Sequence, residues 1–516
     1  MAAPLVEIPE RFNAASIFVD EQIKQGRGER VAIAYGDQTY TYAQVLEGVN
    51  RCGNMLRSLG VEAENRVMLL TLDCPEMVFG FFGAMKIGAV PIPTNTLLRA
   101  PDYEYLLNDS RAKVVIVSEP LLTQVEQALP NLKHLKHIVV VGNAHRNLSY
   151  HELTGKASEF LRAEEMSRDD TAFWLYSSGT TGFPKGAVHL HHDMLVTSRL
   201  YAKPVLGINQ NDRTLSVAKL FFAYGLGNAL YFPFSVGAST VLYPGRPDPI
   251  VYFQSIEKYK PTIFYGVPTM YAAMLAVEGA EKKYDLSSLR FCVSAGEALP
   301  AAFYERWKQK FGVEILDGIG STEILHIFIS NRAGRVKPGS SGELVPGYEA
   351  KIVDERGQPV PPGEVGDLLV KGDSTCPYYW NKHQKTKETI IGEWIRTGDK
   401  YVQDTDGYFW YQGRSDDMLK AGGIWVSPVE VEATLVQHPA VLEAGVVGHA
   451  DSDALVKPMA YVVLKQGQTA SDALAKELQD FVKDKIAPYK YPRWIRFVPE
   501  LPKTATGKIQ RYKLRG

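Results

Sequence analysis

The first part of the chain alternates apolar runs with amphipathic segments of helical spacing. Residues 41–44, Thr-Tyr-Ala-Gln, match a capping box, and apolar side chains then recur at helical spacing until Gly60. Apolar runs at residues 67–72 and 89–92 flank a segment that Pro75 opens, a pattern typical of a βαβ unit. We therefore expect a capped helix followed by two parallel strands.

Two further β-branched runs, at residues 113–117 and 137–141, continue this pattern. Fully apolar strands of this length suit a parallel sheet that helices cover on both faces. The large N-terminal part is therefore expected to be α/β, with mostly parallel sheets covered by helices.

The pattern changes after about residue 340, where Gly and Pro become frequent and short alternating runs predict an antiparallel β subdomain over about 340–415. Beyond Asp416, apolar spacing predicts a small mobile α+β domain. Its expected helices are 429–435 and the segment after Ser471, and its expected strands lie near 441–447, 461–464 and 494–498. The sequence thus predicts two domains, 1–415 and 416–516, with a hinge near Asp416.

Composition fits an ordinary globular protein of more than one core, since 45% of the 516 residues are hydrophobic and 22% are charged. With 57 basic and 58 acidic residues, the chain has no overall charge that favours nucleic acid or an anionic membrane. The longest apolar stretch, residues 77–90, is interrupted by Lys86 and is too short to span a bilayer. We expect a soluble cytoplasmic protein with small-molecule partners, no nucleic acid or membrane partner, and a homodimer as one open assembly.

A short loop at residues 176–186 is the clearest candidate for binding chemistry. Its sequence, Tyr-Ser-Ser-Gly-Thr-Thr-Gly-Phe-Pro-Lys-Gly, directly follows an apolar run. Glycines allow backbone N–H groups to close on a polyphosphate, hydroxyls donate to its oxygens, and Lys185 neutralises charge. Composition alone leaves two interpretations open, a phosphate-binding loop and a solvated turn.

The loop does not match the P-loop pattern G-x-x-x-x-G-K-[ST]. Counting from Gly179, Pro184 stands where the second glycine is needed, and Gly186 stands where a hydroxyl would reach magnesium. The residues after Lys185 also form a strand-like run where a P-loop opens a helix. A kinase or GTPase is therefore disfavoured.

The loop resembles the signature loop of the adenylate-forming superfamily, which includes acyl-CoA synthetases, adenylation domains of peptide synthetases, and luciferases. The resemblance covers essentially the whole chain, because five further motifs follow in the order of that family. They are Ser-Ala-Gly-Glu (294–297), Asp-Gly-Ile-Gly-Ser-Thr-Glu (317–323), Trp-Ile-Arg-Thr-Gly-Asp (394–399), Gly-Arg-Ser-Asp-Asp (413–417) and Pro-Lys-Thr-Ala-Thr-Gly-Lys (502–508).

The resemblance implies that ATP, Mg²⁺ and coenzyme A take part, and that a carboxylate attacks the α-phosphorus of ATP. Thr322 would contact the α-phosphate and Glu323 would hold Mg²⁺, which prefers carboxylate oxygen. The remaining residues assigned to the nucleotide by resemblance are Ser177, Ser178, Thr180, Thr181 and Lys185 for the phosphates, Asp317 and Gly318 for adenine, Asp399 for the ribose, and Arg414 beside it for a hydroxyl or a phosphate.

Lys508 would act from the mobile C-terminal domain by bridging the attacking carboxylate and the α-phosphate. Asp416 matches the hinge, and rotation about it would bring in a loop containing Gly422 and Gly423 as a passage for the pantetheine arm of coenzyme A. Without the resemblance, Lys508 would be a basic chain end and the glycines an ordinary turn.

Two segments look like the benzoate-CoA ligase branch of the family, Lys-Leu-Phe-Phe-Ala-Tyr-Gly-Leu-Gly (219–227) and Gly-Ser-Thr-Glu-Ile-Leu-His-Ile-Phe (320–328), so the acid is expected to be benzoate. Amino-acid-activating members place an Asp at the position aligned with Phe222, so a substrate ammonium would have no charge partner here. The expected pocket residues are Phe222, Ala223, Tyr224, Gly320, His326 and Ile327. They would form a short, flat slot suited to one aromatic ring.

Several alternatives stay open from sequence. The acid could be another aryl or a medium-chain acid, and the acceptor could be the thiol of a carrier protein. Luciferase-like oxidation and a catalytically inactive nucleotide-binding regulator are the other candidates. His189, His191 and His192 lack a Cys or acidic partner at ligand spacing, and we expect them to shape a strand-to-helix junction near Asp193.

Overall fold

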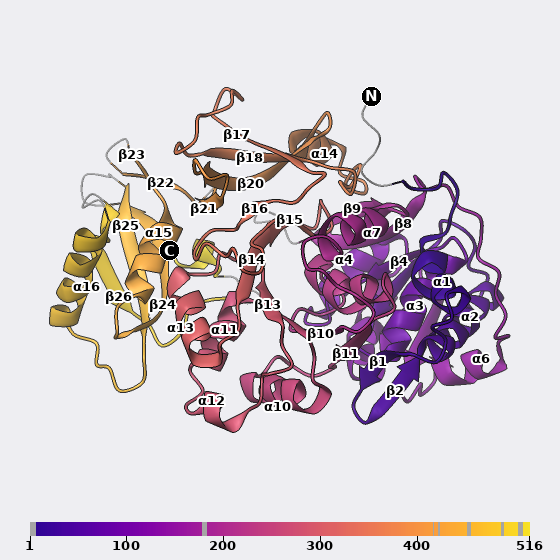
Figure 1. Cartoon of the computed structure of the whole chain (residues 1–516). Coiled ribbons are helices and arrows are strands. Elements are labelled where there is room, and N and C mark those ends of the chain that lie inside the picture. Colours follow the sequence, from indigo (N-terminus) through magenta and orange to yellow (C-terminus); the bar gives the residue numbers. More distant parts are fainter. Residues whose placement is uncertain are drawn as a thin grey trace.

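The computed structural model describes residues 7–177, 183–415, 417–421, 424–450, 456–486, 490–503 and 509–515. Two sheets with intervening helices form the N-terminal body, an antiparallel β unit lies beside it, and a small unit follows at the C-terminal end (Figure 1). The expected α/β class is confirmed.

The first sheet has five parallel strands in the order β4-β3-β5-β6-β7. Its strands are β3 (Arg66–Leu70), β4 (Val90–Pro93), β5 (Val114–Ser118), β6 (His137–Val141) and β7 (Leu148–Ser149). The helices between them are α3 (Pro75–Lys86), α4 (Ala100–Ser110) and α5 (Leu122–Ala128), and α6 (Tyr150–Lys156) follows β7. The predicted βαβ pattern is therefore present, with β3 to β6 within two residues of their expected positions, whereas β7 was not predicted.

Helix α2 (Tyr42–Ser58) begins with the predicted capping box, in which Thr41 Oγ1 accepts from the Gln44 N–H and the Gln44 side chain accepts from the Thr41 N–H. It packs closely on α3. A Cβ added at Gly83 would lie 2.9 Å from the carbonyl oxygen of Val49, so only glycine permits this approach.

The second sheet has nine strands in the order β16-β15-β14-β13-β12-β10-β11-β1-β2. Six central strands, β14 to β1 in that order, are parallel, and the outer strands are antiparallel. The bounds are β1 (Val31–Tyr35), β2 (Gln38–Thr41), β10 (Arg213–Ser216), β11 (Ser239–Leu242), β12 (Ile263–Gly266), β13 (Phe291–Ser294), β14 (Ile315–Gly320), β15 (Ile327–Ser330) and β16 (Glu343–Leu344). Helices of this part include α10 (Pro249–Tyr259), α11 (Pro268–Leu275), α12 (Ala280–Lys283) and α13 (Ala301–Phe311).

The segment after residue 340 forms an antiparallel sheet in the order β17-β18-β20-β19, with β21 paired to β20. The elements are β17 (Glu349–Val353), β18 (Gly366–Lys371), α14 (His383–Thr389), β19 (Ile390–Ile391), β20 (Trp394–Gln403) and β21 (Phe409–Arg414). Its antiparallel character agrees with the alternating pattern of the sequence.

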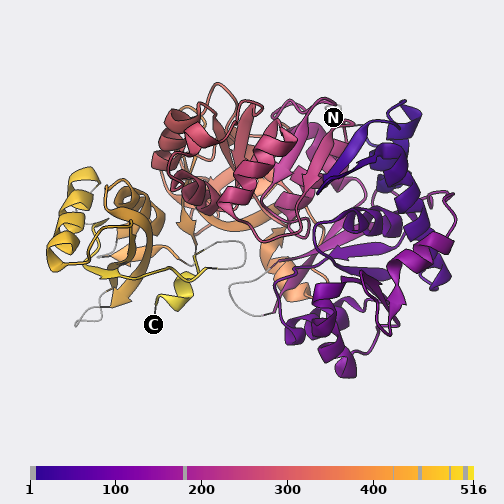
Figure 2. The same ribbon diagram turned by 90° about the horizontal axis from the view of Figure 1, so that it is seen from below.

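The C-terminal part contains the β22–β23 hairpin and a three-stranded sheet, β24-β25-β26. The elements are β22 (Leu419–Ala421), β23 (Ile424–Val426), α15 (Pro428–Val436), β24 (Val441–Ala450), β25 (Val456–Leu464), α16 (Asp472–Lys485) and β26 (Trp494–Phe497). Both views place this unit at one end of the molecule (Figures 1 and 2). Trp307 of α13 and Leu435 of α15 belong to one buried apolar cluster, which joins the unit to the body.

No helix in the described part of the chain combines the length and apolar character needed to cross a membrane.

Candidate active site

The candidate phosphate loop connects two strands of a hairpin, β8 (Thr171–Ser177) and β9 (Lys185–Leu190). Ser177 pairs with Lys185 in the antiparallel register, so the two residues face each other at the base of the loop. Ser178, Thr180 and Thr181 lie outside the described residues. The structure thus places the ends of the predicted loop, on a β-hairpin and not on the strand-to-helix turn of a P-loop.

Lys185 and Glu323 come together on one side chain that the sequence did not single out, Tyr379. The Lys185 Nζ lies 4.8 Å from the centre of the Tyr379 ring, and the Tyr379 hydroxyl donates to Glu323 Oε1 at 2.6 Å. Burial lowers the pKa of Lys185, the Glu323 carboxylate opposes this change, and Arg414 adds to it. The three charged groups therefore act on one another across a shared site.

The backbone explains how Tyr379 reaches this position. Its segment lies against β9, where the Trp380 N–H donates to the Gly186 carbonyl at 2.8 Å and Tyr379 forms a bridge with Ala187. No local motif around Tyr379 predicts this pairing, which depends on a contact between segments almost 200 residues apart. It is a candidate functional residue that sequence reasoning missed.

Thr322 and Glu323 lie in a tight turn directly after β14. The Leu325 N–H donates to the Thr322 carbonyl at 3.2 Å, and Leu325 has φ of 71°, a left-handed conformation that is costly for a side chain of this size. The Glu323 carbonyl accepts from the Cys376 N–H at 2.7 Å. The turn is thus held by two backbone hydrogen bonds, with Leu325 in a strained conformation.

Asp317 lies near the carboxyl end of β14, opposite Ser294 of β13. Its Oδ2 accepts from the Leu299 N–H at 3.3 Å, and burial raises the pKa of Asp317 to about 8. A Cβ added at the neighbouring Gly318 would lie 2.7 Å from the Ile329 carbonyl oxygen, so glycine is required there. The carboxyl ends of parallel strands are where open α/β sheets bind ligands.

Asp399 and Arg414 face each other on the paired strands β20 and β21. The Arg414 Nη1 lies 3.1 Å from Asp399 Oδ1 and also donates to the Thr397 carbonyl at 3.1 Å. Gly398, with φ of 76°, has no side chain that would collide with the guanidinium, which is 2.7 Å from a Cβ built there. The structure therefore joins Arg414 to Asp399, the residue that the resemblance assigns to the ribose.

The predicted acid pocket brings together two segments about 100 residues apart in sequence. Tyr224, in the short helix α8 (Ala223–Leu226), lies with its ring centre 5.6 Å from that of His326, and its hydroxyl is 3.2 Å from the carbonyls of Gly266 and Val293. The other predicted members are Phe222 before α8, Ala223 in it, Gly320 at the end of β14 and Ile327 at the start of β15.

His326 is buried among rings, with the centre of Phe232 at 4.4 Å and that of Tyr201 at 5.5 Å. Its Nε2 lies 3.2 Å from the Tyr224 carbonyl, which can only accept, so Nε2 carries the proton. Burial lowers the pKa of His326 to about 3, which keeps the ring neutral. Its Nδ1 has no partner among the described residues.

The three clustered histidines have separate structural contacts. His189 lies within β9 and not after it, and its Nε2 is 2.8 Å from the Thr322 carbonyl. His191 Nδ1 accepts from the Ala14 N–H at 3.1 Å, and His192 Nδ1 lies 2.9 Å from the Arg168 carbonyl. Within the described ranges no group of three His, Cys, Asp or Glu side chains is arranged to hold a metal.

Four residues with predicted roles near the C-terminal unit, Asp416, Gly422, Gly423 and Lys508, lie outside the described residues. The structure does describe the residues on either side of the segment that contains Lys508. Lys503 and Ile509, on either side of the Lys508 loop, form an antiparallel bridge.

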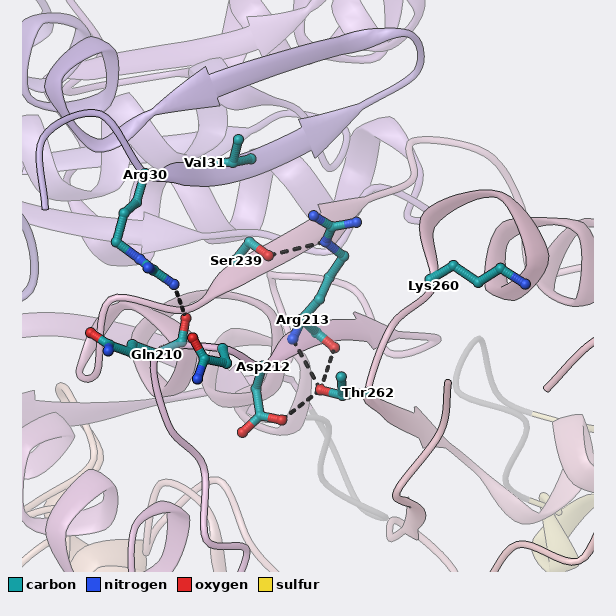
Figure 3. Close-up of a pocket in the computed structure, with 9 residues that line it drawn as sticks. Arg30, Val31, Gln210, Asp212, Arg213, Ser239, Lys260 and Thr262 are labelled. Carbon is teal, nitrogen blue, oxygen red and sulfur yellow. Dashed lines mark hydrogen bonds between the residues drawn. The ribbon is translucent and has the colours of Figure 1, made fainter. Parts of the chain in front are cut away.

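A cavity of about 400 Å³ lies at the opposite edge of the nine-stranded sheet, where β1, β10 and β11 begin (Figure 3). Its cations are engaged within the chain: Arg30 donates to the Gln210 carbonyl and Arg213 Nε to Ser239 Oγ at 3.1 Å. None of the predicted site residues lines this cavity, so it is not the candidate active site.

Two models of known protein families match this chain. The model of the AMP-binding enzyme family matches residues 19–380, and that of the AMP-binding enzyme C-terminal domain matches residues 430–508. The chain is 51% identical over 514 residues to the benzoate–CoA ligase of Thauera aromatica, covering 99% of this chain and 97% of that protein.

Two solved structures are similar over nearly the whole chain. The anthranilate CoA ligase AuaEII in complex with anthranoyl-AMP gives a TM-score of 0.95 at 49% identity, covering 98% of this chain and 97% of that one. A benzoate CoA ligase from Burkholderia xenovorans LB400 gives 0.92 at 48% identity, covering 98% and 100%.

Proposed function

The chain belongs to the AMP-binding enzyme family, and on this basis we propose that it is an ATP-dependent ligase that activates benzoate as benzoyl-AMP and transfers the benzoyl group to coenzyme A. The observation that carries the proposal is the convergence of Lys185 and Glu323 on Tyr379, beside the carboxyl end of β14. This arrangement offers one cation, Lys185, for a nucleotide polyphosphate and one carboxylate, Glu323, for the metal ion that accompanies it.

In the proposed first step, a carboxylate oxygen of benzoate attacks the α-phosphorus of ATP and pyrophosphate leaves. The attack joins two anions, so catalysis depends on positioning them and neutralising charge. Lys185 would neutralise the leaving phosphates together with Ser177, Ser178, Thr180 and Thr181. Thr322 would donate to the α-phosphate oxygen.

The nucleoside would lie between the sheet and the β unit. Asp317 and Gly318 would face adenine, and the Asp399 carboxylate would accept from the ribose hydroxyls while Arg414 holds it in place. Two observations support these assignments: Asp317 and Gly318 are consecutive residues of β14, which ends at Gly320, and Asp399 is paired with Arg414 across β20 and β21.

The donor set fits Mg²⁺ that arrives with ATP. Mg²⁺ is usually bound by one or two carboxylates together with substrate phosphates, not by a cage of protein ligands. Glu323 supplies one carboxylate, and Tyr379 donates to Oε1 while no described residue donates to Oε2. Bound there, the ion would offset the charge that develops on the phosphates.

The acid pocket supports an aryl substrate. Phe222, Tyr224 and His326 carry rings, and burial lowers the pKa of His326 to about 3, so none of these three residues offers a fixed charge to a substrate amine or a second carboxylate. The benzoate carboxylate would instead be directed toward the α-phosphate and Lys508.

A ring-substituted benzoate such as a 2-aminobenzoate is the second candidate acid. The observation that favours it is His326 Nδ1, a buried acceptor without a partner among the described residues, which an amino group could satisfy. Medium-chain acids and a carrier-protein thiol remain the alternatives that the same fold would allow.

For the second step we propose that residues 416–516 rotate as a unit about Asp416, withdraw Lys508 and present the Gly422–Gly423 passage to coenzyme A. The thiol sulfur would then attack the acyl carbon and AMP would leave. A pyrophosphate-release assay over benzoate, amino-, hydroxy- and halobenzoates, short fatty acids and amino acids tests the substrate assignment. An aliphatic acid that exceeded benzoate by more than about tenfold, the scale of one pocket contact, would overturn it.

A further inference from the structure

Two buried polar side chains at the end of β9 have no part in the proposed chemistry. His189 and Asp193, the first residue of α7 (Asp193–Thr197), are both 0% exposed, and His189 Nδ1 lies 2.7 Å from Asp193 Oδ2. The imidazole stacks on Phe173 with the ring centres 5.2 Å apart. The ring is therefore fixed in position and orientation.

Both ring nitrogens of His189 face acceptors. Nε2 lies 2.8 Å from the Thr322 carbonyl oxygen, which has no proton to give, so Nε2 must donate. Asp193 Oδ2 also accepts from the Leu190 N–H at 3.1 Å, so the same oxygen holds both the imidazole and the backbone at the end of β9. His189 is thus hydrogen-bonded at both ring nitrogens, to Asp193 through Nδ1 and to Thr322 through Nε2.

The Thr322 carbonyl belongs to the peptide that carries Glu323. Glu323 is already held at its own carbonyl by the Cys376 N–H and at Oε1 by Tyr379, so His189 supplies the contact on the preceding peptide group. β9 begins at Lys185, and the hydrogen bond therefore joins the strand of the phosphate loop to the turn of the proposed magnesium carboxylate.

Stability alone is a weak reason for such a pair, because the desolvation cost of burying two titratable side chains can exceed the gain from their attraction. We propose that Asp193 and His189 form a hydrogen-bond chain that orients the Thr322–Glu323 peptide, which makes His189 a positioning residue for the binding of the metal–nucleotide complex. This inference rests on the proposed function of Glu323 and extends it to residues that never touch the substrate.

The test uses Mn²⁺ as a paramagnetic substitute for Mg²⁺ and measures the affinity of the full chain for Mn·ATP by electron paramagnetic resonance, without any acid. His189→Gln places an amide N–H near the Nε2 position, whereas His189→Asn reaches only toward Asp193. We expect His189→Asn to weaken Mn·ATP binding by about tenfold or more, the usual scale for groups that orient a metal ligand, and His189→Gln to restore most of it.

His192→Gln is the matched control, because His192 lies in the same turn and near Asp193 but does not contact Thr322. Thermal unfolding of each variant separates loss of fold from loss of binding. Wild-type affinity in a folded His189→Asn variant would overturn the inference.

A measurement on the unmodified protein covers the case in which the variants do not fold. In ¹⁵N-histidine-labelled protein, the Nε2 of His189 should carry a proton, and an unprotonated Nε2 would contradict the hydrogen bond to Thr322. If no acid released pyrophosphate while the Mn·ATP differences held, the proposed function would fail and the positioning role would stand.

Discussion

The hydroxyl of Tyr379 donates to Glu323 Oε1 at 2.6 Å while its ring lies 4.8 Å from Lys185 Nζ. One side chain therefore contacts both charges proposed to bind the metal–nucleotide complex. Because the hydroxyl fixes the carboxylate rotamer and the ring supports the ammonium by a cation–π contact, the two functions can be separated by mutation.

Tyr379→Phe should keep the ring contact and lose the hydrogen bond. We expect kcat for pyrophosphate release to fall by about tenfold, with a larger Mg²⁺ requirement and little change in thermal stability. Steady-state kinetics at several Mg²⁺ concentrations measure this. The adjacent Tyr378→Phe serves as the control, since Tyr378 is 38% exposed. Identical kinetics for both variants would exclude a role for the Tyr379 hydroxyl.

Asp399→Asn should weaken ATP binding by removing the charge that accepts from the ribose hydroxyls and pairs with Arg414. A hydrogen bond to a charged group is worth about 1.5–3 kcal/mol, so the KM for ATP should rise by about tenfold or more, while the KM for the acid stays close to wild type. Asp406→Asn, in an exposed turn of the same β unit, is the control. A raised KM for the acid instead would place Asp399 outside the ribose site.

Lys508→Ala, or acetylation of Lys508, should abolish adenylation and spare thioester formation from synthetic benzoyl-AMP. Loss of one donor to a developing charge costs about 10²–10³ in rate, and only the first half-reaction uses this ammonium in our proposal. Single-turnover assays of the two half-reactions separate the effects, with the exposed Lys513→Ala as the control. Equal loss of both would contradict the assignment.

Asp317 should make the stability of the protein depend on pH. Its folded-state pKa of about 8 is above the ordinary value, so the folded chain holds a proton that the unfolded chain releases. This stabilising contribution is complete below about pH 4 and is lost as the pH rises toward 8, with a limiting slope of about 1.4 kcal/mol per pH unit. Asp317→Asn should remove this contribution to the slope and leave that of other buried carboxyl groups such as Asp73, whose pKa burial raises to about 6.

Thermal unfolding midpoints of the wild type and of Asp317→Asn at pH 5 and pH 8 check this expectation. The wild type should lose more stability between the two values than the variant. Parallel changes in both proteins would show that Asp317 does not bind the proton.

Much of the fold follows from local pattern. The capping box at Thr41 starts α2 as expected, and the apolar runs become parallel strands because only a sheet buried on both faces accepts them. The order of the strands in the nine-stranded sheet cannot be predicted from local pattern. β1 pairs with β11 through Ile33 and Thr240, a long-range contact that no local periodicity specifies.

The candidate site likewise contains residues that the sequence predicted and contacts that it did not predict. Motif resemblance identified Lys185, Glu323, Asp399 and Arg414, and the structure brings them into two linked groups. Tyr379 and the contact of His189 with Thr322 were not predicted, since each depends on the packing of distant segments and neither residue lies in a recognisable motif.

The most direct test of the proposed activity is to incubate the protein with ATP, Mg²⁺, benzoate and coenzyme A and to quantify every product. Our account predicts pyrophosphate, AMP and benzoyl-CoA in equal amounts, with pyrophosphate release dependent on benzoate. Release of ADP and phosphate in place of AMP and pyrophosphate, or no acid-dependent pyrophosphate release with any acid of the panel, would contradict it.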